Sequence, residues 1–464
     1  MADIVAALRA ALPDGTVLTD PDLLRGHQRD EADLVPYGMP AVVVRPRSTA
    51  DVVTVVKTAA AAGVPVIAQG ARTGLAGAAN AIDGAIVLST VAMNEILEID
   101  PVNRVAVVQP GVVNSALAAA ARDAGLRYPP DPGSWESSTI GGNVATNAGG
   151  MCCVKYGVTA EYVIGLEVVL ASGEVLRTGR RTAKGVAGYD LTRLFVGSEG
   201  TLGIITSVTV ALRPPADESL TLIAVFPTTA AAGEAVAAIS SGGLSPSLLE
   251  LLDQTHLIAI EALRPMGLRT DAKALLLASV DTGSRAPADL ALLAAACEAA
   301  GAVEVYSATD AVEAAELLRA RRLAHAAMEK YAAETYPEGK GGLIIDDVAV
   351  PRTAMAVMLD GIEKIALEYD IPIGVVGHAG DGNLHPNIVI DRASPASIER
   401  GRGAFDAIMQ LGLSLGGTCT GEHGVGLLKR DWLATEVGPV GMDVHRAIKA
   451  ALDPAGLLNP GKIL

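Results

Sequence analysis

Two glycine-rich segments in the second half of the chain carry its most reactive groups. Residues 377–387 read Gly-His-Ala-Gly-Asp-Gly-Asn-Leu-His-Pro-Asn, and residues 421–424 read Gly-Glu-His-Gly. The two segments hold three of the seven histidines in the chain. Because glycine lets a backbone turn tightly and come close to a ligand, we expect a site for chemistry at these segments.

His378, His385 and Glu422 form a candidate metal-ligand set. Imidazole and carboxylate ligands suit Zn²⁺ and its neighbours, and three protein ligands leave positions open for a substrate oxygen. The spacing differs from the His-Glu-x-x-His pattern of a helix, and a lone histidine is more often a hydrogen-bonded polar residue. Asp381 is an alternative further ligand, although an Asp between glycines usually forms a turn.

Two further residues could act on a bound substrate. His423 follows Glu422 directly, and because adjacent side chains diverge, it is left to serve as a general base near neutral pH. The alternative is a hydrogen-bonded loop histidine. Arg321 lies in a helical run with Arg319 and Arg322. It could clamp a carboxylate through two hydrogen bonds, or the run could form a solvated helix face.

The first half of the chain contains three loops rich in glycine and small polar residues. Residues 70–77 follow a predicted strand, so their backbone N–H groups could cradle a pyrophosphate. The loop lacks the Gly-x-Gly-x-x-Gly pattern, which argues against a Rossmann fold, and an ordinary turn is the alternative. Residues 137–150 and 197–205 form the other two loops. A structural loop that ties strands together is the alternative for the second, and a tight turn before a strand is the alternative for the third. The first two loops, in one domain, favour an extended dinucleotide ligand.

The predicted elements indicate two domains, the second of α+β type. Residues 41–210 alternate short Val- and Ile-rich strands with Ala-rich helices, and the stretch from 128 to 156 reads as a long functional loop. Pro214 and Pro215 mark a boundary. Beyond it, predicted strands alternate with helices over residues 229–239, 287–299, 311–333, 354–368 and 395–413.

Composition excludes several classes of protein. The net charge of −16 argues against nucleic-acid binding, and no apolar run reaches the ~18 residues of a membrane span. The N-terminus lacks the pattern of a signal peptide. Four cysteines in 464 residues are too few for a disulfide framework, so we expect a cytoplasmic protein, with peripheral membrane association as an alternative.

Taken in order, these motifs resemble one known family. The resemblance rests on the first glycine loop, residues 139–150, Gly188-Tyr189-Asp190-Leu191, residues 197–205, both histidine segments and residues 453–462. The chain resembles the FAD-linked 2-hydroxy-acid dehydrogenases of the vanillyl-alcohol-oxidase type. That family includes glycolate oxidase subunits, D-lactate dehydrogenases and D-2-hydroxyglutarate dehydrogenases. The resemblance implies an α+β FAD-binding domain of two subdomains over residues 1–215. A cap domain with an antiparallel sheet would span residues 216–452, and a tail over residues 453–464 would return to the first domain.

The resemblance also implies roles for particular residues. His378, His385 and Glu422 would bind the metal, most simply Zn²⁺, with Mn²⁺ or Fe²⁺ as alternatives. Arg321 would hold the substrate carboxylate, Asn387 would contact substrate, and His423 would be the base. FAD would be bound without a covalent link by residues of the glycine loops and the tail: Gly70, Ala71, Arg72, Thr73, Gly74, Leu75, Ala78, Pro132, Ser137, Ser138, Gly141, Gly142, Asn143, Thr146, Asn147, Gly149, Gly150, Gly157, Glu199, Gly203, Ile205 and Asn459.

The chain departs from the family pattern at a few positions. Gln69 and Arg72 stand where relatives often carry Arg and Gly or Asn. Ile345 stands where relatives that act on 2-hydroxyglutarate carry a Lys for the distal carboxylate, although Lys340 could compensate. The departure favours a monocarboxylate, D-lactate or glycolate, over D-2-hydroxyglutarate.

Partners and rival functions remain open at this point. The electron acceptor is unknown, and a homodimer or association with an electron-transfer subunit is compatible with the sequence. Two other functions are also compatible with these residues, a metallohydrolase and a flavin-binding subunit without catalytic activity.

Overall fold

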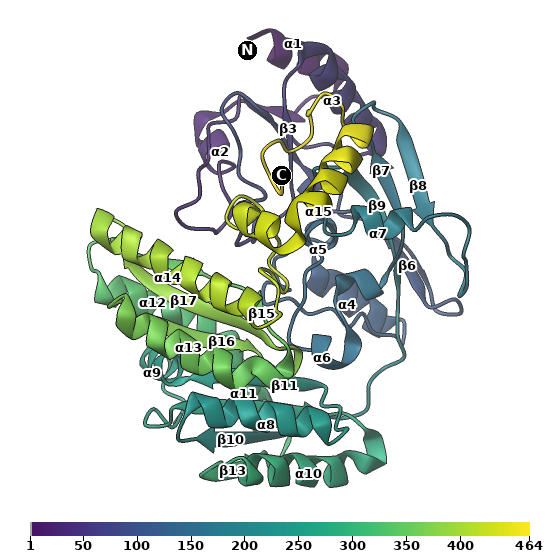
Figure 1. Cartoon of the computed structure of the whole chain (residues 1–464). Coiled ribbons are helices and arrows are strands. Elements are labelled where there is room, and N and C mark those ends of the chain that lie inside the picture. Colours follow the sequence, from purple (N-terminus) through teal and green to yellow (C-terminus); the bar gives the residue numbers. More distant parts are fainter. Residues whose placement is uncertain (1) are drawn as a thin grey trace. The chain divides into compact units, whose positions relative to one another are not determined.

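A computed structural model describes residues 2–464, and the chain forms two compact units (Figure 1). The first unit comprises the residues up to Gly149 together with Gly157–Pro215 and Glu422–Leu464. The second unit comprises Gly150–Tyr156 and Ala216–Gly421. Each unit is described separately below.

The first sheet of the first unit is built from short runs of Val and Ile that are buried on both faces. Its strand order is β1-β2-β4-β3, with β1 antiparallel to β2 and the other three strands parallel. Helix α3 begins at a capping box between Ser48 and Asp51 and ends at Gly63, whose φ of 63° suits glycine. The elements are α1 (Ala2–Ala11), β1 (Val17–Leu18), α2 (Pro21–Arg25), β2 (Val42–Val44), α3 (Thr49–Ala62), β3 (Val66–Gln69) and β4 (Ile86–Ser89).

The second sheet of the first unit is antiparallel, with the order β5-β6-β9-β7-β8. Strand β9 shows the alternating burial of a sheet with one covered face. The elements are β5 (Ile96–Asp100), β6 (Val105–Val108), α4 (Asn114–Asp123), α5 (Ile140–Thr146), β7 (Val163–Val169), β8 (Val175–Gly179), α7 (Leu191–Phe195) and β9 (Ile204–Ala211).

The C-terminal segment completes the first unit. Helix α15 (Arg430–Leu452) is interrupted at Gly438 and Pro439, as expected where proline removes a helical hydrogen bond. The chain then turns at Asp453, whose carboxylate accepts hydrogen bonds from the N–H groups of Leu457 and Leu458. Leu458 pairs with Val66 beside β3, so the chain returns to the first sheet.

The second unit is organised around one antiparallel sheet. The strand order is β13-β10-β12-β11-β16-β17-β14, and β15 pairs with β17. The strands are β10 (Leu220–Phe226), β11 (Leu248–Asp253), β12 (Ala274–Val280), β13 (Glu304–Ser307), β14 (Gly341–Ile345), β15 (Val348–Ala349), β16 (Ile373–His378) and β17 (Asn383–Asp391).

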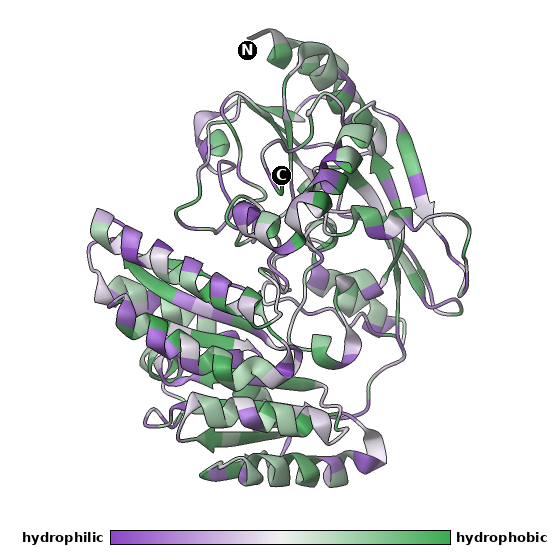
Figure 2. Cartoon of the chain, in the orientation of Figure 1, coloured by the Kyte–Doolittle hydropathy of each residue, from purple (hydrophilic) through white to green (hydrophobic). Residues whose placement is uncertain are grey.

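Helices cover both faces of this sheet (Figure 1). Alternate strand residues such as Leu275 and Leu277 pack with Ala324 and Met328 in one apolar cluster. Figure 2 shows apolar strands beneath helices whose outer faces are hydrophilic. The helices of this unit are α6 (Cys153–Tyr156), α8 (Thr229–Ser241), α9 (Gln254–Leu263), α10 (Ala286–Ala299), α11 (Ala311–Arg322), α12 (Ala324–Thr335), α13 (Met355–Glu368) and α14 (Pro395–Ser414).

The structure corrects three sequence predictions. The stretch from 128 to 156 contains helices α5 and α6, because Thr139 caps α5 by accepting from Gly142 N–H. The helix predicted over residues 311–333 is two helices that meet at Leu323. Strand β11 was not predicted at all, although its six residues are all buried.

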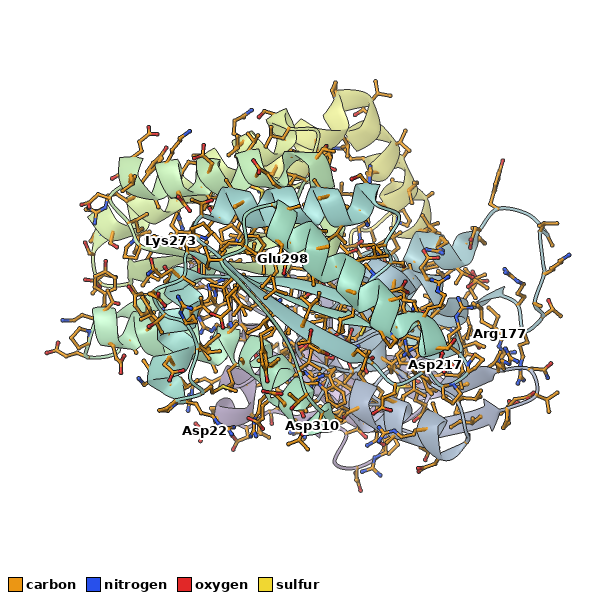
Figure 3. All side chains as sticks on the ribbon, turned by 90° about the horizontal axis from the view of Figure 1, so that it is seen from below. Asp22, Arg177, Asp217, Lys273, Glu298 and Asp310 are labelled. Atoms are coloured by element: carbon orange, nitrogen blue, oxygen red, sulfur yellow. The ribbon has the colours of Figure 1, made fainter. Side chains whose placement is uncertain are left out.

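Charged side chains lie mainly at the surface, as Asp217, Glu298 and Asp310 do (Figure 3). Glu250 and Asp347 are exceptions, because both are fully buried. Across the described residues, every helix is too short or too polar to span a membrane.

Candidate functional site

The loop that follows β3 presents a run of backbone donors. Within the described chain, the N–H groups of residues 71–76 donate no hydrogen bond. Unpaired backbone N–H groups are rare in folded proteins unless a ligand or solvent meets them. A series of such groups along a loop is the usual way in which backbone binds phosphate.

Glycine allows the other cofactor loop to approach this one closely. A Cβ atom at Gly70 would lie 2.4 Å from Thr139 Oγ1, and one at Gly141 would lie 2.5 Å from the Cβ of Pro110. A larger residue at Gly70 would therefore push the two loops apart, and one at Gly141 would clash with Pro110. That both loops belong to one FAD site stays a prediction.

The C-terminal tail holds a third loop against the first. Asn459 Nδ2 donates to the carbonyl oxygens of Ala78, at 2.9 Å, and Glu199, at 2.6 Å. The Glu199 carboxylate in turn accepts from the N–H groups of Val425 and Gly426. Loops that are far apart in sequence thus share one hydrogen-bond network around the candidate FAD site.

Burial shifts the pKa values of the ionisable groups in this network. Burial raises the pKa of Asp30 to about 6 and that of Glu199 to about 7. Burial also lowers the pKa of Lys462 to about 8. Each shift favours the uncharged form of a group that has been removed from water.

The predicted cofactor residues differ in their contacts with this network. Gly70, Ala78, Glu199 and Asn459 belong to the contacts described above, and Thr146 ends helix α5. Ser137 is exposed, and Gly150 belongs to the second unit. Other glycines are required by packing, since a Cβ at Gly157 would lie 2.6 Å from Glu161 Cγ, and one at Gly203 2.4 Å from Val168 Cγ1. The cofactor contacts of the whole predicted set stay predictions.

In the second unit, strand β16 places His378 beside a buried carboxylate. The Nδ1 atom of His378 lies 2.9 Å from both carboxylate oxygens of Glu250, on the neighbouring strand β11. This contact directs the remaining ring nitrogen, Nε2, away from Glu250. Metal-binding histidines are commonly held by a carboxylate in this way.

His385 has a similar arrangement on strand β17. Its Nδ1 atom lies 3.6 Å from Asp347 Oδ1, and Asp347 also accepts a hydrogen bond from Thr420 Oγ1 at 2.7 Å. The rings of His378 and His385 are 5.2 Å apart and nearly perpendicular, with ligand nitrogens within 4.8 Å of one another. The second unit therefore contains a buried cluster of His, Asp and Glu side chains.

The predicted substrate residues border this cluster. Arg321 Nε lies 2.7 Å from Glu250 Oε2, although the atoms are not aligned as a hydrogen bond. No other ion pair or hydrogen bond of the Arg321 side chain is found among the described residues. Asn387 Nδ2 donates to the carbonyl of His385 at 2.8 Å. The structure thus brings Arg321, Asn387 and the two histidines together.

Glu422 and His423 belong to the first unit, immediately after the end of the second. His423 Nε2 and Glu422 Oε1 are 3.8 Å apart. A Cβ at Gly149 would lie 2.3 Å from Glu422 Oε2. Glu422 therefore packs against one of the predicted FAD loops.

Sequence reasoning missed Glu250 and did not assign Asp347 to the site. Glu250 stands alone in the apolar run Leu-Leu-Glu-Leu-Leu over residues 248–252. A carboxylate in a buried strand is rare unless it is paired, so this run carried a usable signal. No comparable local signal identifies the partners, because Glu250 and His378 are 128 residues apart.

Comparison with known proteins identifies the family. A family model described as FAD linked oxidases, C-terminal domain, matches residues 216–463, and one described as FAD binding domain matches residues 40–179. The chain is 44% identical to glycolate oxidase subunit GlcD of Bacillus subtilis, over 92% of this chain and 89% of that protein. It is 35% identical to D-lactate dehydrogenase of Anaerostipes hadrus, over 96% and 94% of the two chains.

A solved structure of p-cresol methylhydroxylase with bound substrate is similar in fold, with a TM-score of 0.80 and 19% identity over 100% of this chain and 96% of that one. The chain belongs to the FAD-linked oxidases, and it is an FAD-linked oxidoreductase. The predicted fold class, an FAD-binding domain of this type followed by a domain with an antiparallel sheet, is confirmed.

The raised pKa of Glu199 predicts a pH-dependent contribution to stability. Its folded-state pKa of about 7 exceeds the ordinary value of 4.5, so the native state binds the extra proton between these values. This contribution is fully present below pH 4.5 and is lost as pH rises to about 7. We expect the Glu199→Gln variant, relative to wild type, to lose less stability between pH 4.5 and 7 in chemical unfolding experiments. Parallel pH profiles for the two proteins would contradict the assignment.

Proposed function

We propose that this protein oxidises a 2-hydroxy monocarboxylic acid, D-lactate or glycolate, to the corresponding 2-oxo acid. The observation that carries the proposal is the buried group of His378, His385, Arg321 and Asn387 in the second unit. Cationic and imidazole groups are the partners that a hydroxy acid needs for its carboxylate and hydroxyl. Relatives named glycolate oxidase subunit and D-lactate dehydrogenase support the same substrate class.

The first unit fits FAD through its backbone and its glycines. The unpaired N–H groups of residues 71–76 suit the pyrophosphate, and the close contact of Gly70 with Thr139 leaves the loops in a compact cradle. FAD bound by these loops would supply the redox chemistry, as the acceptor of a hydride from the substrate carbon. The protein contributes by holding the loops in place through Asn459 and Glu199.

The second unit fits a divalent metal through its donor set. The candidate ligand nitrogens of His378 and His385 lie within 4.8 Å of one another, and each imidazole lies beside a carboxylate. A carboxylate in this position orients an imidazole for binding a metal. Zn²⁺ held there, with Mn²⁺ or Fe²⁺ as alternatives, would lower the pKa of a substrate hydroxyl.

Glu422 is the proposed third ligand because of its place in the chain. The preceding residue, Gly421, donates its N–H to the Asp347 carbonyl at 2.9 Å. A Cβ at Gly421 would also lie 2.4 Å from the side chain of Asn383. Glu422 follows this anchored residue by one peptide bond, and consecutive Cα atoms are about 3.8 Å apart.

The remaining site residues receive distinct roles in the proposal. Arg321 binds the substrate carboxylate through one edge of its guanidinium, and Glu250 contacts the other edge. Asn387 contacts the substrate. His423 removes the hydroxyl proton as hydride leaves the adjacent carbon. The proposal requires that His423 and Arg321 reach the same substrate molecule.

Two features favour a monocarboxylate over 2-hydroxyglutarate. Ile345 pairs with Asn387 across strands β14 and β17, so the position where some relatives carry a Lys is apolar here. Lys340, the alternative cation, is exposed and forms an ion pair with Glu338 at 2.8 Å. A second carboxylate would therefore be buried without a partner, which is costly.

The relative named glycolate oxidase subunit GlcD suggests a partner for this chain as well. We include in the proposal an association with other subunits that accept electrons from the reduced flavin.

The substrate proposal is tested by anaerobic bleaching of the flavin. We expect D-lactate or glycolate to bleach the absorbance of the purified yellow protein, and D-2-hydroxyglutarate and L-lactate to bleach it much more slowly. A colourless protein with hydrolase activity would replace the proposal with the metallohydrolase alternative. A yellow protein that none of the four acids bleaches would indicate a flavin-binding subunit without catalytic activity.

The base assignment predicts a specific defect in His423→Ala. We expect this variant to retain flavin but to be reduced by substrate ~10²- to 10⁴-fold more slowly, since general base catalysis contributes about that factor. Stopped-flow absorbance measures the rate of reduction. The exposed His445 provides a matched control, and His445→Ala should react like wild type. A wild-type reduction rate in His423→Ala would refute the assignment.

The contacts of Glu250 predict that Glu250→Gln weakens both metal binding and substrate binding. We expect Zn²⁺ affinity to fall about 10- to 100-fold and KM to rise, because both His378 and Arg321 lose the charge that positions them. Chelator competition measures the affinity, and initial rates give KM and kcat separately. Glu298→Gln, at an exposed helix position, is the control. Unchanged Zn²⁺ affinity in Glu250→Gln would remove Glu250 from the metal site.

A further inference from the structure

Two arginines of the first unit converge on one buried histidine. Arg72 Nη1 lies 3.2 Å from His27 Nδ1, and Arg45 Nη2 lies 3.5 Å from His27 Nε2. His27 is only 4% exposed. The cluster therefore holds two permanent positive charges around a side chain that has been removed from water.

Neighbouring hydrogen bonds determine which nitrogen of His27 carries its proton. Gln69 Nε2 donates to the carbonyl oxygens of His27 and Ala79, so Gln69 Oε1 is the atom that faces His27 Nδ1, at 2.7 Å. Nδ1 must then be the donor of that bond. Nδ1 cannot also accept a hydrogen bond from Arg72. The guanidinium of Arg72 therefore faces another hydrogen-bond donor.

Within the part of the chain that the structure describes, the two arginines lack an acidic partner. Among the described residues, neither Arg45 nor Arg72 forms an ion pair with a carboxylate, and Arg45 Nε is buried without a hydrogen-bond partner. Burial and the charge of Arg45 together lower the pKa of Arg72. Burial, aided by both arginines, likewise lowers the pKa of His27. Buried guanidinium groups without a counter-charge are unfavourable unless an anion binds to them.

The backbone at Arg72 adds an independent observation. Its φ of 63° lies in the left-handed region, which is unfavourable for a residue with a Cβ and is normally occupied by Gly or Asn. Residues held in such a conformation concentrate at ligand sites. Arg72 also lies within the loop whose N–H groups at residues 71–76 are unpaired. A side-chain cation, Arg72, and unpaired backbone donors therefore occur on the same loop.

We propose that Arg45 and Arg72 form a side-chain anion subsite that binds the pyrophosphate of FAD together with the backbone N–H groups of residues 71–76. In this arrangement His27 and Gln69 hold the two guanidinium groups apart and keep the imidazole uncharged. The inference rests on the proposed FAD site and assigns Arg45 and His27 a part in it.

Arg72→Gly tests the inference because we expect it to raise thermal stability and to weaken FAD binding. Glycine relieves the backbone strain, so the flavin-free protein should melt at a higher temperature than wild type. The same variant should bind FAD about tenfold or more weakly, since charge-assisted hydrogen bonds to phosphate are lost. Flavin-fluorescence titration of the flavin-free protein measures the affinity. If Arg72 had only a structural role, its replacement by glycine would not raise the melting temperature and weaken FAD binding together.

Further variants separate charge from loop flexibility. Arg72→Asn keeps a residue that tolerates the left-handed conformation, and Arg45→Gln leaves the loop backbone unaltered, so both should weaken FAD binding. Arg47→Gln, at a neighbouring exposed position, should bind FAD like wild type. Riboflavin, which lacks the pyrophosphate, should bind all variants with the wild-type affinity.

Wild-type FAD affinity in Arg72→Asn and Arg45→Gln would overturn the inference. An equal loss of riboflavin and FAD binding would also overturn it, because that result indicates a distorted cradle and not a lost phosphate contact. Failure of the proposed function is distinguishable, since a protein that binds FAD through these arginines but oxidises no 2-hydroxy acid would leave the anion subsite intact.

Discussion

The carboxylate of Glu250 is the interaction on which the candidate site of the second unit depends. It is fully buried and contacts both His378 and Arg321. A buried carboxylate is tolerated only where cationic or donor groups surround it, so the three side chains stabilise one another. Because β11 and β16 are adjacent strands, the backbone ladder fixes the separation of Glu250 and His378. A single strand pairing thereby positions a candidate metal ligand, His378, beside the carboxylate that also contacts the candidate carboxylate clamp, Arg321.

The two units use different chemistry to prepare their sites. The first unit relies on backbone, with unpaired N–H groups on one loop and glycines where loops touch. The second relies on side chains that project from a rigid sheet, where neighbouring strands keep them in register. This division fits the two tasks of such an enzyme. A long, flat cofactor needs many weak backbone contacts along its length, and a small substrate needs a few strong groups at fixed positions.

The sequence predicted local features well and non-local ones poorly. Strand β3 and the helices α8, α10, α13 and α14 follow from periodicity and end signals, because neighbouring residues decide them. The histidine segments were recognisable for the same reason. Strand β11 was missed because its apolar run fits a buried helix equally well, and Glu250 was missed with it. The partner of a buried charge is set by strand order, which no short window of sequence contains.

The return of the chain at Leu458 and Asn459 has a consequence for biosynthesis. Leu458 pairs with Val66, and Asn459 holds the loops of Ala78, 381 positions earlier, and Glu199, 260 positions earlier. A ribosome must therefore synthesise residue 459 before the hydrogen bonds that join these loops can form. A nascent chain that stalls earlier would leave the carbonyl oxygens of Ala78 and Glu199 without the amide that ties them together.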